Sequence, residues 1–185
     1  MNKNILKNFA VRSRKELVEK VKIKAAKQGI KKEHIENLDT IRHSEKIICS
    51  EREKLQREMI INRIETLNKN GDEGYNIVIE EIACSWFNRF IALRFMEVNK
   101  YIPETFIIKD NEYNSIQEIN GIDFSMDMGK IQGMKLNRDV EGIFRYVILS
   151  RCNALNKVLP FIFEEWADYT ELLFPEDLLS GKNFV

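Results

Sequence analysis

The sequence predicts a mainly α fold, with several helices around a central buried helix at about residues 73–100. Three observations support this prediction. Hydrophobic residues make up 44% of the chain and charged residues 31%, as is typical of helix-rich globular proteins. Two long stretches, 4–28 and 51–68, repeat apolar residues every three or four positions. A third, 86–98, is apolar on nearly every side. The 185 residues suffice for a real core, so we expect one domain over residues 1–185.

The first two helices are predicted from their apolar stripes and their ends. Residues 4–28 place one stripe along the helix, and Gly29 is a good C-terminal stop; the stripe contains Leu6, Ala10, Leu17 and Val21. Residues 31–37 and 39–48 favour shorter helical turns. Ser50 is a suitable N-cap for the helix over 51–68, because acidic residues occupy the first turn that follows it.

The central helix carries the densest apolar segment, WFNRFIALRFMEV at residues 86–98. A helix that is apolar nearly all round is expected at the centre of a domain. Its charged residues are then shielded and need partners. Arg94 and Glu97 stand three apart and can pair, whereas Arg89 needs an acid from another element, with candidates near the C-terminus: Glu164, Glu165, Asp168 and Glu171. We interpret Arg89, Arg94 and Glu97 as a structural charge network.

The later part of the chain changes character. A short β-prone stretch and three glycines predict a small β-hairpin or irregular insertion at about residues 101–136. Asn137 is expected to cap the next helix, which keeps helical spacing until Pro160. The residues that follow indicate another short helix or two.

The net charge of zero hides an asymmetry. Residues 1–70 hold 18 Lys and Arg against 10 Asp and Glu, and residues 71–185 hold 11 against 19. Such a basic half and acidic half can reflect a nucleic-acid face, docking of one half on the other, or a solvated helix surface. Five cations of the first helix lie mostly off its apolar stripe and are candidate phosphate contacts for double-stranded DNA: Arg12, Lys15, Lys20, Lys22 and Lys27.

The cysteines and histidines do not indicate a metal site or a disulfide framework. Cys49, Cys84 and Cys152 are odd in number and far apart, so they are interpreted as buried thiols in a reducing compartment. His34 and His43 form no metal-binding pattern with them. No secretory leader or membrane span is visible, so we expect a cytoplasmic protein without membrane contact.

Several catalytic patterns are absent. No acid has a lysine two residues later, as nucleases of the PD-(D/E)xK type require. The eight glycines contain no GxG pair for a nucleotide-like cofactor, and the three prolines are never adjacent, which excludes an NPPY motif. P-loop and GxSxG motifs are absent as well. We therefore expect no catalytic, cofactor-binding or metal-binding residue in this chain.

Three segments nevertheless carry a resemblance to a known family. They are LKNFAVRSRKELVEKVKIKA, WFNRFIALRFMEVNKYIP and CNALNKVLPFIFEEWADYTELLFPEDLL. In this order they are similar to the N-terminal region of PglX, the adenine-specific DNA methyltransferase of BREX phage-defence systems. The resemblance covers essentially all 185 residues, and residues 104–136 match least well.

The resemblance implies a helical N-terminal domain of a larger methyltransferase, whose core would carry the S-adenosylmethionine site and the NPPY motif. Two functions remain open for the domain itself. It could engage DNA through its basic first helix. Alternatively, it could be a scaffold that positions the methyltransferase core or another BREX subunit, with no DNA contact of its own. A change of DNA affinity with salt separates the two, because phosphate contacts give a steep dependence.

Overall fold

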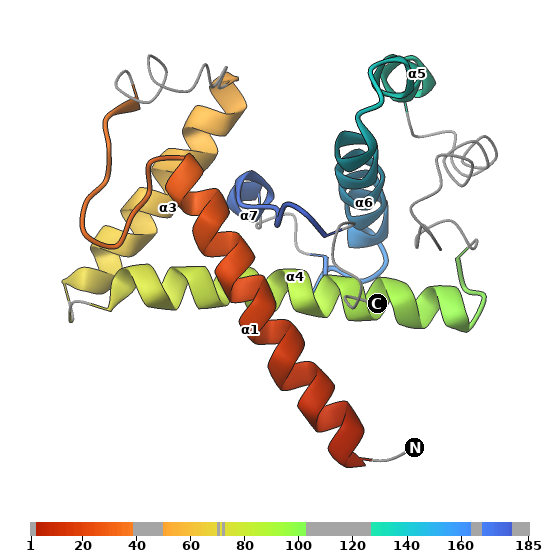
Figure 1. The fold of residues 1–185 in the computed structure, drawn as a ribbon, viewed down its shortest axis with the longest axis horizontal. Coiled ribbons are helices and arrows are strands. Elements are labelled where there is room, and N and C mark those ends of the chain that lie inside the picture. Colours follow the sequence, from red (N-terminus) through yellow and green to blue (C-terminus); the bar gives the residue numbers. More distant parts are fainter. Residues whose placement is uncertain are drawn as a thin grey trace. The chain divides into compact units, whose positions relative to one another are not determined.

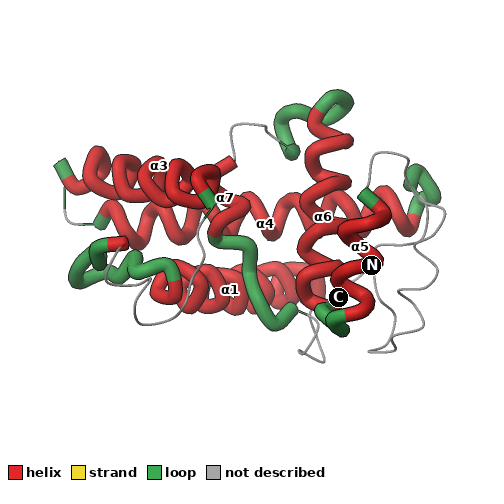
Figure 2. Tube along the Cα trace, turned by 90° about the horizontal axis from the view of Figure 1, so that it is seen from above, coloured by secondary structure: helices red, strands yellow, loops and turns green. Residues whose placement is uncertain are grey.

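The computed structural model describes residues 3–38, 50–69, 71, 73–102, 127–163 and 168–178. Regular structure within these ranges is helical, and an isolated antiparallel bridge joins Ile30 to Ile35. The helices (Figure 1) are α1 (Lys3–Lys27), α3 (Glu51–Asn68), α4 (Gly74–Val98), α5 (Met128–Leu136), α6 (Val140–Asn156) and α7 (Asp168–Leu172). Figure 2 shows helix and loop, with no strand, throughout the described ranges. The prediction of a mainly α fold is confirmed.

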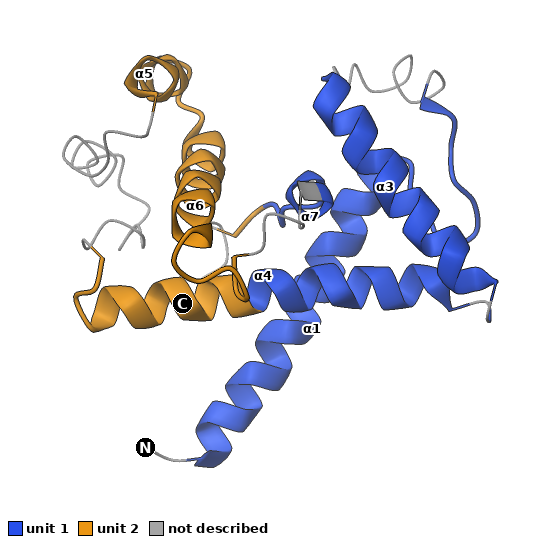
Figure 3. Ribbon diagram, turned by 180° about the vertical axis from the view of Figure 1, so that it is seen from behind, with its two compact units in different colours: residues 1–87, 166–176 blue, residues 88–165, 177–185 orange. Residues whose placement is uncertain are grey.

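The chain divides into two compact units (Figure 3). Unit 1 consists of residues 1–87 and 166–176, and unit 2 of residues 88–165 and 177–185. Helix α4 contributes its first part to unit 1 and its last part to unit 2. The expectation of one domain over residues 1–185 stays a prediction.

The core of unit 1 is built from one face of each of its helices. Helix α1 buries Leu17, Val21 and Ala25 at a spacing of four residues, which keeps them on one side. Helices α3 and α4 add further aliphatic side chains and Trp86, and α3 packs against α7. The fully or nearly fully buried apolar residues of α3, α4 and the segment after α7 are Ile60, Ile64, Val78, Ile79, Ile82, Ala83, Trp86, Leu173 and Phe174.

Polar side chains of α3 hold the loop of residues 28–36 and the first residue of α4. The buried guanidinium of Arg57 on α3 donates to the carbonyl oxygens of Gln28 at 2.9 Å and Glu36 at 2.6 Å. It thereby holds both ends of the loop that follows α1. Between α3 and α4, the backbone N–H of Gly74 donates to Oδ1 of Asn68 at 2.8 Å.

The core of unit 2 comes from α6, α5 and the last part of α4. Helix α5 packs against α6, and the buried apolar residues are Leu93, Met96, Ile131, Ile143, Val147, Ile148, Cys152 and Phe163. Not every apolar residue of α4 is covered. Ile91, Phe95 and Val98 are exposed, although the sequence predicted shielding nearly all round. Hydrophobicity on every side of a helix therefore did not mean burial on every side here.

Three local predictions were wrong. Residues 128–136 form helix α5 instead of part of a hairpin, because the Asp127 side chain accepts a hydrogen bond from the backbone N–H of Lys130 and caps a helix start. The rest of that predicted insertion, residues 103–126, lies outside the described residues. The N-cap of α6 is Asp139, which accepts from Gly142, while Asn137 is the C-cap of α5.

The third correction concerns residues 31–37, which form a closed loop and no helical turn. The chain reverses at Gly29, whose φ is 68°. The backbone N–H of Glu36 then donates to the Gly29 carbonyl at 2.8 Å, beside the bridge between Ile30 and Ile35. Glycine adopts this left-handed conformation at low cost, so the helix ends there and the chain turns back. The predicted turn at 39–48 lies outside the described residues.

Candidate nucleic-acid interface on the first helix

The buried residues of helix α1 begin at Ser13, and its first turns are exposed. Ser13, Leu17, Val21 and Ala25 are buried, whereas every residue from Lys3 to Asn8 is exposed. Leu6, which the sequence placed on the buried stripe, is 50% exposed, and the exposed fraction of Ile5 is 68%. The first turns of α1 therefore offer both apolar and cationic side chains to solvent.

The five cations proposed as phosphate contacts do not share one face of α1. Lys15 and Lys22 are seven residues apart and lie on the same side, as do Lys20 and Lys27. The two pairs are offset by five residues, which is about 140° around the helix. Arg12 and Lys15 are exposed, and in the described part of the chain neither forms an ion pair. Lys22 forms an exposed ion pair with Glu19 at 2.8 Å.

The side of α1 with Lys20 and Lys27 is occupied by an acid from the far end of the chain. The carboxylate of Glu176 accepts hydrogen bonds from the amines of Lys24 and Lys27, one on each oxygen. The amine of Lys20 donates to the backbone carbonyl oxygen of Glu176 at 3.3 Å. Burial would raise the pKa of the Glu176 carboxyl, but the bonds and charges of the two lysines outweigh burial and lower it. Glu176 is therefore held ionised between cations.

The segment that carries Glu176 is anchored in the core of unit 1. The indole Nε1 of Trp86 donates to the Thr170 carbonyl at 3.0 Å. The ring of Phe174 meets Trp86 edge to face, with centroids 4.8 Å apart at 78°. Arg52 on α3 donates to Glu171 at 2.8 Å. These contacts bring residues more than 80 positions apart together and set the place of Glu176 beside α1.

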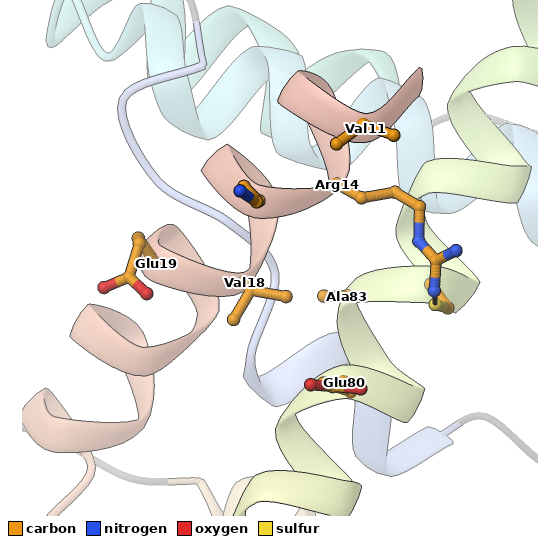
Figure 4. Close-up of a pocket in the computed structure, with 8 residues that line it drawn as sticks. Val11, Arg14, Val18, Glu19, Glu80 and Ala83 are labelled. Carbon is orange, nitrogen blue, oxygen red and sulfur yellow. Dashed lines mark hydrogen bonds between the residues drawn. The ribbon is translucent and has the colours of Figure 1, made fainter. Parts of the chain in front are cut away.

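A groove between α1 and α4 lies on the side of α1 that carries Lys15 (Figure 4). Its volume is about 550 Å³, and it is lined by Val11, Arg14, Lys15, Val18 and Glu19 from α1 and by Glu80, Ala83 and Cys84 from α4. Arg14 reaches across it and donates to the Cys84 sulfur at 2.7 Å. Apolar, cationic and acidic groups therefore meet in one groove.

Two of the three charged residues predicted to form a network on α4 pair with each other, and the third is buried. Arg94 donates to Glu97 at 2.7 Å, and Glu97 is buried. Arg89 is only 3% exposed. Among the acids proposed for Arg89, Glu171 accepts from Arg52, and the side chains of Glu164, Glu165 and Asp168 lie outside the described part of the chain. A structural role for Arg89, Arg94 and Glu97 stays a prediction.

Sequence reasoning missed Lys24, Arg14 and Glu176. The spacing of Lys20, Lys24 and Lys27, four and then three residues, was a signal that all three lie on one side of the helix. Nothing local indicated Glu176, because its contact with Lys24 spans 152 positions. Of the three cysteines, Cys152 is buried as expected, Cys84 is half-buried, and Cys49 lies outside the described residues.

The described residues contain neither a metal-binding cluster nor a helix that could span a membrane. No group of three or more His, Cys, Asp and Glu side chains there is arranged to hold a metal ion. In the same ranges, no helix has the length and hydrophobicity needed to cross a lipid bilayer.

Comparison with known proteins supports the resemblance seen in the sequence. The chain is 28% identical to the adenine-specific methyltransferase PglX of Lacticaseibacillus casei (strain Zhang) over 98% of its own length. It is 30% identical to the adenine-specific methyltransferase BrxX of Escherichia coli O9:H4 (strain HS) over 62% of its length. The matches span only 17% and 10% of these relatives, respectively. No family model and no solved structure matches the chain. The predicted similarity to PglX is confirmed.

Proposed function

We propose that this chain is a non-catalytic helical region of a larger adenine-specific DNA methyltransferase of phage defence, and that α1 contacts the DNA backbone. The relatives that match it are adenine-specific methyltransferases of much greater length. The observation that supports contact with DNA is a set of exposed cations on the amino-terminal half of α1: Lys3, Lys7, Arg12 and Lys15. Exposed lysine and arginine side chains bind phosphate by charge and release counterions.

The chemistry of methyl transfer is assigned to no residue of this chain. S-adenosylmethionine sites use a glycine-rich turn after a strand, where the backbone approaches the cofactor closely. The described residues contain no strand, and the whole sequence contains no GxG pair. The residues present therefore do not fit that cofactor. The role we propose is to position DNA for a methyltransferase core elsewhere in the same polypeptide, in the cytoplasm.

The salt dependence of DNA binding tests this proposal. Reversing Arg12 and Lys15 together to Glu removes two phosphate contacts, so the slope of log affinity against log salt falls by about 1.8 for duplex DNA. Reversing Lys69 and Lys157, two exposed lysines outside α1, makes the same change in net charge and serves as the control. Equal slopes for both double variants and the parent would overturn the proposal. Binding should show no sequence preference, because phosphate contacts position the protein without reading bases.

A second candidate function is docking on protein, either the methyltransferase core or another BREX subunit. The exposed apolar residues Ile5, Leu6 and Val11 on α1 favour it, because several exposed apolar side chains on one helix are typical of an interface. If α1 contacts DNA, replacing Ile5 and Val11 with Ser leaves DNA affinity unchanged. If α1 docks on protein, the same replacement weakens association with the methyltransferase core, measured by sedimentation of the mixture.

A further inference from the structure

Three lysines of α1 converge on one acidic residue of the same chain. Lys24 and Lys27 donate to the two carboxylate oxygens of Glu176, and Lys20 donates to its backbone carbonyl. Three lysine amines therefore contact oxygens of one residue. Two oxygens that share one negative charge are also what a nucleic-acid phosphodiester presents to lysine. The Glu176 carboxylate therefore resembles a backbone phosphate in its single negative charge and its two acceptor oxygens.

We propose that Lys20, Lys24 and Lys27 form a second phosphate-binding site on α1. Glu176 occupies this site and thereby weakens the binding of the chain to DNA. This inference rests on the DNA contact proposed above. It adds a site on the opposite side of α1 from Lys15 and Lys22, and it names the residue that regulates that site.

Approach of a phosphate to the amines of Lys24 and Lys27 requires the Glu176 carboxylate to move away from them. The side chains of Lys27 and Glu176 are 50% and 36% exposed, whereas that of Lys24 is 14% exposed. A phosphate can therefore approach from the Lys27 side. The backbone next to Glu176 is held by buried Phe174 and Pro175, so it stays in place while the carboxylate rotates toward solvent. Because the segment is anchored, Glu176 remains near the lysines and competes with phosphate at high local concentration.

The charge-neutral variant Glu176→Gln tests the proposal directly. Gln keeps the length of the side chain and one acceptor oxygen but loses the negative charge. Binding of the 185-residue chain to a labelled duplex of about 20 base pairs is followed by fluorescence anisotropy across about 50–200 mM salt. We expect tighter binding at the lowest salt and a slope steeper by about 0.9 for each lysine released, hence by about 0.9–1.8. The matched control is Glu58→Gln, an exposed acid of α3 with the same change in net charge.

A second variant separates release of the lysines from a general effect on folding. Lys27→Gln should lower the slope by about 0.9 in the Glu176→Gln background and by less in the parent, since Glu176 neutralises Lys27 only in the parent. Equal effects of Lys27→Gln in both backgrounds, or equal slopes for Glu176→Gln, Glu58→Gln and the parent, would overturn the inference. If Arg12 and Lys15 still govern the slope in that case, the proposed function stands. If neither the parent nor any variant binds DNA, both proposals fail.

Discussion

Replacing Trp86 with Phe tests whether one indole secures the C-terminal segment of unit 1. Trp86 is fully buried, donates to the Thr170 carbonyl at 3.0 Å and packs edge to face on Phe174. Phe retains an aromatic ring for Phe174 but has no N–H. The substitution therefore removes the hydrogen bond while it largely keeps the aromatic contact, which is worth about 0.5–1.5 kcal/mol.

The expected loss follows from two contributions. A buried carbonyl that loses its donor costs about 1–3 kcal/mol. The smaller ring leaves a cavity beside Phe174, which adds about 1 kcal/mol. We therefore expect Trp86→Phe to lower the free energy of unfolding by about 2–4 kcal/mol, a loss large enough to fall outside the range of ordinary surface substitutions.

Urea unfolding followed by far-UV circular dichroism measures this loss. The midpoint should fall while the slope of free energy against urea stays unchanged. Phe95→Leu is the control, because Phe95 is an aromatic residue of the same helix that is 60% exposed, and its substitution should change stability by less than about 0.5 kcal/mol. A Trp86→Phe variant as stable as this control would refute the role assigned to the indole.

Three other outcomes are expected. Gly74→Ala should be destabilising, because the new Cβ would lie 2.4 Å from a backbone carbonyl oxygen of α3, whereas Gly133→Ala meets nothing within 4 Å and should stabilise by about 0.4–1 kcal/mol in thermal unfolding. Ser50→Ala removes one partner of the capping box of α3 and should cost about 1 kcal/mol, measured by urea unfolding. The lowered pKa of Glu176 gives stability that is present above the ordinary carboxyl pKa and is lost as pH falls through the lowered value. The stability difference between the parent and Glu176→Gln should therefore shrink as the pH falls from neutral through the lowered pKa, and a constant difference would contradict the assignment.

The helices that were predicted well have signals within a few residues of their ends. Ser50 and Glu53 form the predicted start of α3, with a bond in each direction between side chain and backbone. The end of α1 coincides with Gly29, which has a positive φ. Such local signals need no knowledge of the rest of the fold, so sequence alone was sufficient.

The features that the sequence did not predict depend on competition between local signals or on contacts between residues far apart in the sequence. Gly129 and Gly133 indicated a turn, but the cap at Asp127 outweighed their low helix propensity. The exposure of Phe95 depends on which other elements reach that side of α4, and periodicity does not specify this. The contact between Lys24 and Glu176 joins two ends of the chain, so the sequence placed the lysine on a surface but did not supply its partner.

Unit 1 is discontinuous in sequence, and this has a consequence for its synthesis on the ribosome. Residues 1–87 emerge first, but the segment 166–176 that completes the unit follows only after residues 88–165. The Thr170 carbonyl that Trp86 binds is synthesised 84 residues after Trp86. Glu171, the partner of Arg52, is synthesised 119 residues after Arg52. At about 5–20 residues per second, the first of these delays lasts about 4–17 s. During that interval Trp86 lacks the ring of Phe174 and the Thr170 carbonyl, so the nascent chain exposes an apolar surface until residues 166–176 have been synthesised.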